Sequence, residues 1–100
     1  MNVLLLTCAD KKEADKIANK LLEKKLIVCV KKTPVSSSFL WKNKVESSKE
    51  VLLIMDSVIE NFEEINSEVK KVHSYKTFVL TSFLVSQTTK DVENWVKKEL

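Results

Sequence analysis

The chain contains no glycine and no arginine among its 100 residues, and it has only one proline and one histidine. Without glycine, the backbone cannot approach a phosphate as glycine-rich phosphate loops and dinucleotide fingerprints do, so these motifs are excluded. Without arginine, no guanidinium fork is available for guanine edges or phosphates. The net charge of +3 comes from scattered lysines. Such scattered charge favours solubility, and we expect no nucleic-acid partner.

Long apolar runs are also missing. No segment approaches the roughly 20 apolar residues of a membrane span, and residues 1–6 lack the basic region and the small-residue cleavage site of a signal peptide. We therefore expect a cytoplasmic protein with no membrane partner. The composition, 44% hydrophobic and 31% charged, is typical of a folded chain. Its length predicts a single domain over residues 1–100.

Hydrophobic periodicity predicts alternating strands and helices. The strands are expected at residues 3–8, 26–30, 44–55 and 77–85, with a further extended segment at 39–41 after the Pro34 and Ser36–Ser38 interruption. The helices are expected behind two capping boxes, Asp10–Glu13 and Ser57–Glu60, and behind Thr88-Thr89. Their inner faces are predicted from apolar residues at helical spacing: Ala14, Ile17, Ala18, Leu21 and Leu22; Ile59, Phe62, Ile65, Val69 and Val72; Val92, Trp95 and Val96.

The resulting order, βαββαβα, predicts an α+β ferredoxin-like sandwich with helices on one face of an antiparallel sheet. In this topology the first strand pairs with the third and the fourth, and the second lies at an edge. Cys8 and Cys29 then fall on non-adjacent strands. Because a disulfide needs a Cα spacing of roughly 4.4–6.8 Å, we expect both to be free thiols.

An extended β-hairpin is predicted around Asn43, because asparagine tolerates the positive φ that tight hairpin turns require. Its second strand contains the run 51–55, which is apolar on both faces, as in a strand covered from both sides. The predicted helices cover only one face. Leaving the apolar side chains of the other face exposed to water would cost many kcal/mol, at roughly 25 cal/mol per Å² of apolar surface. The simplest cover is another copy of the chain, so we expect a homo-oligomer.

Several landmarks recur in order along the chain. They are Thr7, Glu23–Leu26, Cys29, Pro34, Trp41, Lys44, Glu50, the tripeptide His73-Ser74-Tyr75 and Trp95. This ordered set resembles the CutA-type divalent-cation-tolerance family over nearly the whole chain. The resemblance implies a ferredoxin-like fold, an intertwined homotrimer and similarity to PII-type signalling proteins. It also implies a link to tolerance of copper and other divalent cations.

The departures from this family pattern fall at its proposed copper ligands. Some members are thought to use a cysteine late in the first strand and two successive histidines. Here the corresponding residues are Leu6 and Val72, so that only His73 matches, and Cys8 lies two residues beyond the cysteine position. The Pro-Glu pair that follows the family tyrosine is replaced by residues 78–79, Phe-Val. Val79 therefore stands where the family has a carboxylate.

His73 and Cys8 are the candidate metal ligands. One imidazole cannot hold a transition metal alone, so His73 would need Cys8 or Glu50 of a neighbouring subunit, with Cu(I) favoured if a thiolate joins. The alternative is that His73 is only a helix C-terminal residue.

Three aromatic residues, Trp41, Tyr75 and Trp95, either line an inter-subunit cleft for a small ligand or pack at an interface. Glu50 is expected to pair with Lys44 across that interface or to act as a ligand. No catalytic constellation is present, since a single histidine has no nucleophile or second metal ligand at a recognisable spacing. We therefore expect a non-enzyme.

Two functions are compatible with these observations. The first is a non-catalytic divalent-cation, and specifically copper, tolerance or metal-response protein. The second is a PII-like interaction module that receives a small molecule or a partner loop between subunits, without metal.

Overall fold

A computed structural model describes residues 1–100 and consists of one four-stranded antiparallel sheet with three α-helices. The elements are β1 (Asn2–Cys8), α1 (Lys11–Glu23), β2 (Cys29–Trp41), β3 (Lys44–Ser57), a 3-10 turn (Ile59–Asn61), α2 (Phe62–Val72), β4 (Leu80–Leu84) and α3 (Lys90–Glu99). The strand order is β2-β3-β1-β4. The predicted ferredoxin-like topology is confirmed, including the pairing of β1 with both β3 and β4.

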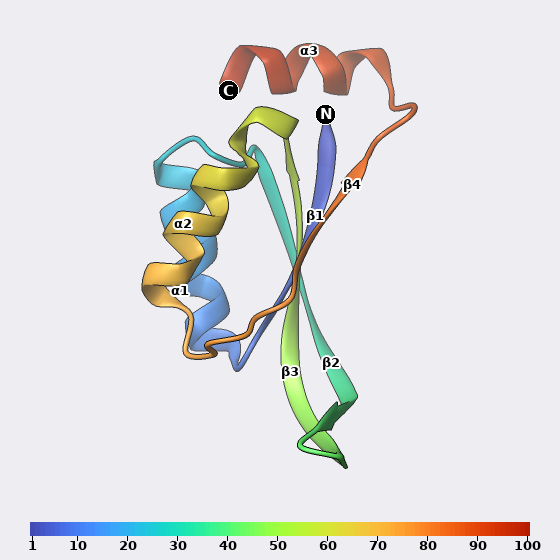
Figure 1. Ribbon diagram of the computed structural model, residues 1–100. Coiled ribbons are helices and arrows are strands. Elements are labelled where there is room, and N and C mark those ends of the chain that lie inside the picture. The colour runs from blue at the N-terminus through green and yellow to red at the C-terminus, as the bar shows by residue number, and fades with distance from the viewer.

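The core lies between the sheet and the pair α1 and α2, which stand on one side of the sheet in Figure 1. Residues alternate in burial along β1, with Leu4, Leu6 and Cys8 buried and Leu5 partly exposed. A strand turns successive side chains to opposite faces, so the buried set faces the helices. These residues pack in one cluster with Ile17 of α1 and other helix residues.

The first capping box forms largely as predicted. Asp10 is the N-cap of α1, and its Oδ1 accepts the N–H of Glu13 at 2.8 Å. Glu13 Oε2 reaches back to the N–H of Ala9 at 2.7 Å, one residue before the cap. The small shift leaves the second oxygen of Glu13 free for a distant segment.

The second capping box was predicted wrongly. Ser57 is the buried last residue of β3, and its hydroxyl donates to the carbonyl of Leu26. Asn61 donates to the same carbonyl at 3.2 Å. With its hydroxyl committed to the loop after α1, Ser57 cannot cap a helix. Ile59, predicted on the inner helix face, lies in the 3-10 turn and is 53% exposed.

The second strand is longer than predicted and starts later. Leu26 and Ile27 are buried loop residues, and β2 runs without interruption from Cys29 through Pro34 to Trp41. Because β2 is an edge strand, a proline that lacks an N–H is tolerated there.

The hairpin between β2 and β3 extends beyond the body of the molecule (Figure 1), whose largest dimension is 45 Å. Its serines pair across the ribbon, with Ser38 Oγ and Ser47 Oγ 3.2 Å apart. Lys42 and Asn43 form the turn with φ of 51° and 65°. The predicted hairpin is thus confirmed, with positive φ at both central residues, as a type I′ turn requires.

β4 is shorter than predicted, and α3 is less buried than predicted. β4 begins at Leu80, so residues 73–79 form a connection instead of the start of a strand. In α3, Val96 is buried, but Trp95 is 44% exposed, and Thr89 caps the helix without a side-chain hydrogen bond. In Figure 1 this helix crosses the end of the sheet near the N-terminus, away from the hairpin.

The sheet face that points away from α1 and α2 carries apolar side chains. Leu5 and Leu52 are half-buried there, and Phe83 is 52% exposed. At the end of the hairpin Leu40 is 77% exposed. Cys8 and Cys29 are both free, with β3 between their strands. None of the helices has both the length and the apolar character needed to span a bilayer.

Candidate functional site

The connection between α2 and β4 folds over the C-terminal end of β1. It begins at His73, which follows α2 and whose N–H closes the last helical turn on the carbonyl of Val69 at 2.8 Å. The His73 side chain is fully buried. From there the chain leaves extended, with φ −64° and ψ 134° at His73. This geometry turns the imidazole inward, against β1.

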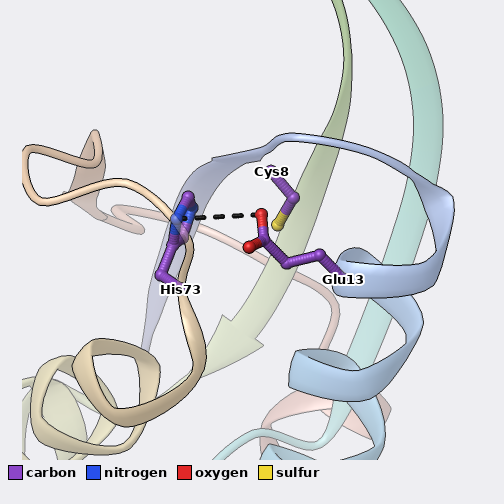
Figure 2. A group of neighbouring side chains, drawn as sticks. All are labelled: Cys8, Glu13 and His73. Carbon is purple, nitrogen blue, oxygen red and sulfur yellow. Dashed lines mark ion pairs between the residues drawn. The ribbon is translucent and has the colours of Figure 1, made fainter.

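Three potential metal ligands meet at this point (Figure 2). Cys8 ends β1, Glu13 lies in the first turn of α1, and His73 follows α2; one ligand atom of each lies within 4.8 Å of the others. Glu13 Oε2 and His73 Nδ1 are 3.7 Å apart. The structure therefore brings the two predicted ligands, Cys8 and His73, together within one chain. It adds Glu13, which sequence reasoning assigned only to a capping box.

The hydrogen bonds of His73 assign a role to each of its ring nitrogens. Its Nε2 lies 2.8 Å from the carbonyl of Thr7, which can only accept, so Nε2 carries the proton. Its Nδ1 accepts the N–H of Tyr75 at 3.1 Å. Both ring nitrogens are therefore occupied. The approach of Nδ1 to Glu13 becomes an ion pair only when the ring is protonated, which would break the bond to Tyr75.

Glu13 bridges two segments that are far apart in sequence. Oε2 accepts the N–H of Ala9, and Oε1 accepts the N–H of Ser74 at 2.6 Å. Burial is the largest single influence on its pKa and raises it. The backbone donors, together with the nearby His73, outweigh burial, and the pKa of Glu13 is lowered overall. Glu13 is thus a carboxylate at neutral pH.

Cys8 is a thiol in this environment. Burial, followed by the negative charges of Glu13, Asp10 and Glu50, raises its pKa to about 12. A thiolate is the form that binds metal. A cation that binds at this cluster must therefore displace a strongly held proton.

The donor set suits a borderline or soft divalent cation. Thiolate, imidazole and carboxylate are the usual ligands of Zn²⁺, and the thiolate and imidazole also suit copper. The three residues lie close enough to share one ion after small side-chain movements. Binding through His73 Nδ1 would also displace the N–H of Tyr75. Cys8, Glu13 and His73 therefore fit a metal ion by ligand type and proximity. Binding would cost the proton of Cys8 and the hydrogen bond between the Tyr75 N–H and His73 Nδ1.

A second polar contact lies next to this cluster. The hydroxyl of Tyr75 donates to Glu50 Oε2 at 2.7 Å, and Glu50 is only 7% exposed. Burial, the hydrogen bond to Glu50 and that residue's negative charge raise the pKa of Tyr75 to about 12. Within the chain, the partner of Glu50 is therefore Tyr75. Lys44, the predicted partner, lies at the hairpin turn opposite Trp41.

A cleft of about 830 Å³ opens beside this contact. Twelve residues line it, among them Thr7, Phe39, Trp41, Glu46, Glu50 and Tyr75. Two of the three aromatic residues predicted to share a cleft, Trp41 and Tyr75, are thus brought together. Trp95 belongs to α3 and does not line this cleft.

The fold and this site define a small ferredoxin-like protein with a buried thiol, carboxylate and imidazole cluster. The model of the CutA1 divalent ion tolerance protein family matches residues 2–99. The chain belongs to this family, which confirms the resemblance noted in the sequence. Family members are named for tolerance of divalent ions and not for an enzymatic activity.

Individual relatives agree with this assignment. The divalent-cation tolerance protein CutA of Archaeoglobus fulgidus is 36% identical over 95 residues, covering 95% of this chain and 93% of the relative. The CutA protein of Thermotoga maritima is 28% identical over 100 residues, covering 100% of this chain and 99% of the relative.

Solved structures of such proteins share the fold. The A. fulgidus structure, named a periplasmic divalent cation tolerance protein, superposes with a TM-score of 0.96 at 35% identity, covering 98% of this chain and 96% of that one. CutA1 of Pyrococcus horikoshii gives 0.93 at 25% identity, covering 99% and 97%.

Proposed function

We propose that this chain is a non-catalytic divalent-cation tolerance protein that takes up copper or another thiophilic divalent cation at Cys8, Glu13 and His73. The observation that carries the proposal is the convergence of these three ligand atoms within 4.8 Å at the end of β1. The names of the relatives support the choice of a divalent cation as the ligand.

The raised pKa of Cys8 makes a cation at the proposed site compete with a proton. With a pKa of about 12, only about one thiol in 10⁵ is ionised at pH 7, since each pH unit below the pKa is a factor of ten. Cation binding and proton loss are coupled, so the apparent affinity for the cation rises with pH.

The test is a calorimetric titration of the purified chain with Zn²⁺ and, under reducing conditions, with Cu(I). The proposal expects binding that is lost in Cys8→Ala and kept in Cys29→Ala. The two variants are matched, because each removes one free thiol, and Cys29 lies outside the cluster. Equal binding by both variants would overturn the proposed ligand set.

We further propose that the protein works as a homotrimer. The support is the apolar sheet face opposite α1 and α2 and the exposed apolar end of the hairpin, where Leu40 and Val45 are 77% and 73% exposed. An exposed surface of this kind marks an interaction site. Light scattering at micromolar concentration should give three times the 11.5 kDa of the chain. A mass of one chain would reject the trimer. A cytoplasmic location stays a prediction.

The cleft beside Tyr75 supports a second candidate function. A volume of about 830 Å³ is within the roughly 300–1,000 Å³ of small-molecule sites. In this alternative the protein is a PII-like interaction module whose ligand or partner occupies the cleft, and metal is incidental. A thermal-shift screen separates the two, because a specific ligand raises the melting temperature without metal.

A further inference from the structure

The cleft lies on the face of the sheet opposite α1 and α2, between the hairpin and the connection that follows α2. The register places Thr7 beside Leu52 and Glu50 beside Val35, and every second residue of a strand shares a face. Phe39 and Trp41 therefore stand on the same face as Glu50. Residues 75–77, which leave α2 and wrap around the end of β1, form the opposite wall. The cleft is thus built by two segments far apart in sequence.

The walls combine aromatic surface with negative charge. Phe39, Trp41 and Tyr75 supply three rings, and the charged residues at the lining are Glu46, Glu50 and Lys76. Two carboxylates and one ammonium leave a formal charge of −1, in a protein whose net charge is +3. Aromatic faces carry negative potential and attract cations, and the carboxylates add to that attraction.

Glu50 presents an acceptor to this cleft. The side chain is more than nine-tenths buried, and its Oε2 is held by the hydroxyl of Tyr75. Its Oε1 makes no hydrogen bond within the chain and is accessible from the cleft that Glu50 lines. An accessible carboxylate oxygen beside aromatic side chains can accept N–H donors from a ligand. Tyr75 fixes the carboxylate, so that the free oxygen is presented in one orientation.

We propose that the cleft binds a primary ammonium group carried by a small organic cation, with the N–H donors on Glu50 Oε1 and the organic part against Phe39 and Trp41. This inference rests on the interaction-module function and names its ligand class. A neutral ligand would forgo the charge attraction. An anion would meet two carboxylates across a low-polarity wall.

The experiment compares three probes of similar shape and different charge: 2-phenylethylammonium, 2-phenylethanol and phenylacetate. The chain has two tryptophans, so the Trp95→Phe variant makes Trp41 the only tryptophan, and its fluorescence reports on the cleft. We expect the ammonium to bind at least tenfold more tightly than the alcohol, and phenylacetate not to bind. Equal binding of all three probes, or of none, would overturn the proposal. This test leaves Glu50 unsubstituted.

Glu50→Gln then tests the residue itself. An amide keeps the shape and an oxygen for the Tyr75 hydroxyl but removes the charge. The variant should bind the ammonium no more tightly than the alcohol, whereas Glu63→Gln on the exposed surface of α2 should behave as the parent. A preserved ammonium preference in Glu50→Gln would reject the role of this residue. Failure of the probe series leaves the zinc titration and the trimer mass unaffected, so the proposals fail separately.

Discussion

Glu13 is predicted to be the residue whose loss damages the site and the fold together. Its two oxygens accept the N–H groups of Ala9 and Ser74 at 2.7 and 2.6 Å, joining the start of α1 to the connection that carries His73. A hydrogen bond to a charged group contributes about 1.5–3 kcal/mol. Ser74 is exposed, so water replaces much of its bond, and we expect Glu13→Ala to lose about 2–4 kcal/mol of unfolding free energy.

The assay is urea unfolding at a fixed protein concentration, because oligomerisation makes stability depend on concentration. The control is Glu23→Ala, which removes an exposed carboxylate from the other end of the same helix. A thermal melt should show a decrease of about 8–30 °C for Glu13→Ala, at about 4–8 °C per kcal/mol for a domain of this size. A decrease no larger than that of Glu23→Ala would refute the bridging role of Glu13.

Two further predictions concern titration and acid stability. The single tyrosine of the chain, Tyr75, should ionise at about pH 12 instead of 10 in an absorbance titration, because its hydroxyl is buried and bonded to Glu50, and an ordinary value would contradict that contact. Glu68 is held by Lys24 and Lys71, and its pKa falls from 4.5 to about 2. Its stabilisation is therefore complete above about pH 4.5 and lost as the pH falls towards 2, so that the difference in unfolding free energy between the parent and Glu68→Gln should shrink over that range. A difference independent of pH would argue against this ion-pair cluster.

The sequence predicted the topology because its signals are local. Periodic apolar residues define α1 and β1, and Asn43 marks the hairpin turn. Predictions from local sequence patterns were wrong where a residue contacts a partner that is distant in the sequence. Ser57 and Glu60 match a capping box, yet the Ser57 hydroxyl is used by the Leu26 carbonyl, 31 residues away in sequence. Pro34 predicted an interruption, but edge pairing with β3 continues the strand through it.

The candidate site was only half predictable for the same reason. His73 and Cys8 could be named from residue type, since a lone histidine and a thiol are obvious ligands. Glu13 also had a local explanation as a capping residue, and nothing in its spacing indicates that its second oxygen reaches Ser74, 61 residues later. The raised pKa of Cys8 follows from burial and three neighbouring carboxylates, and their distances exist only in the folded chain.

The central claim is that a divalent cation enters the cluster in exchange for the proton of Cys8. The most direct measurement is a Co²⁺ titration at several pH values, with the thiolate-to-metal charge-transfer absorption as the signal. Because Cys8 stays protonated far above neutral pH, the account predicts an apparent affinity that rises about tenfold per pH unit between pH 6 and 8, and no such absorption in Cys8→Ala. Co²⁺ binding without a thiolate band, or with an affinity that does not change with pH, would contradict it.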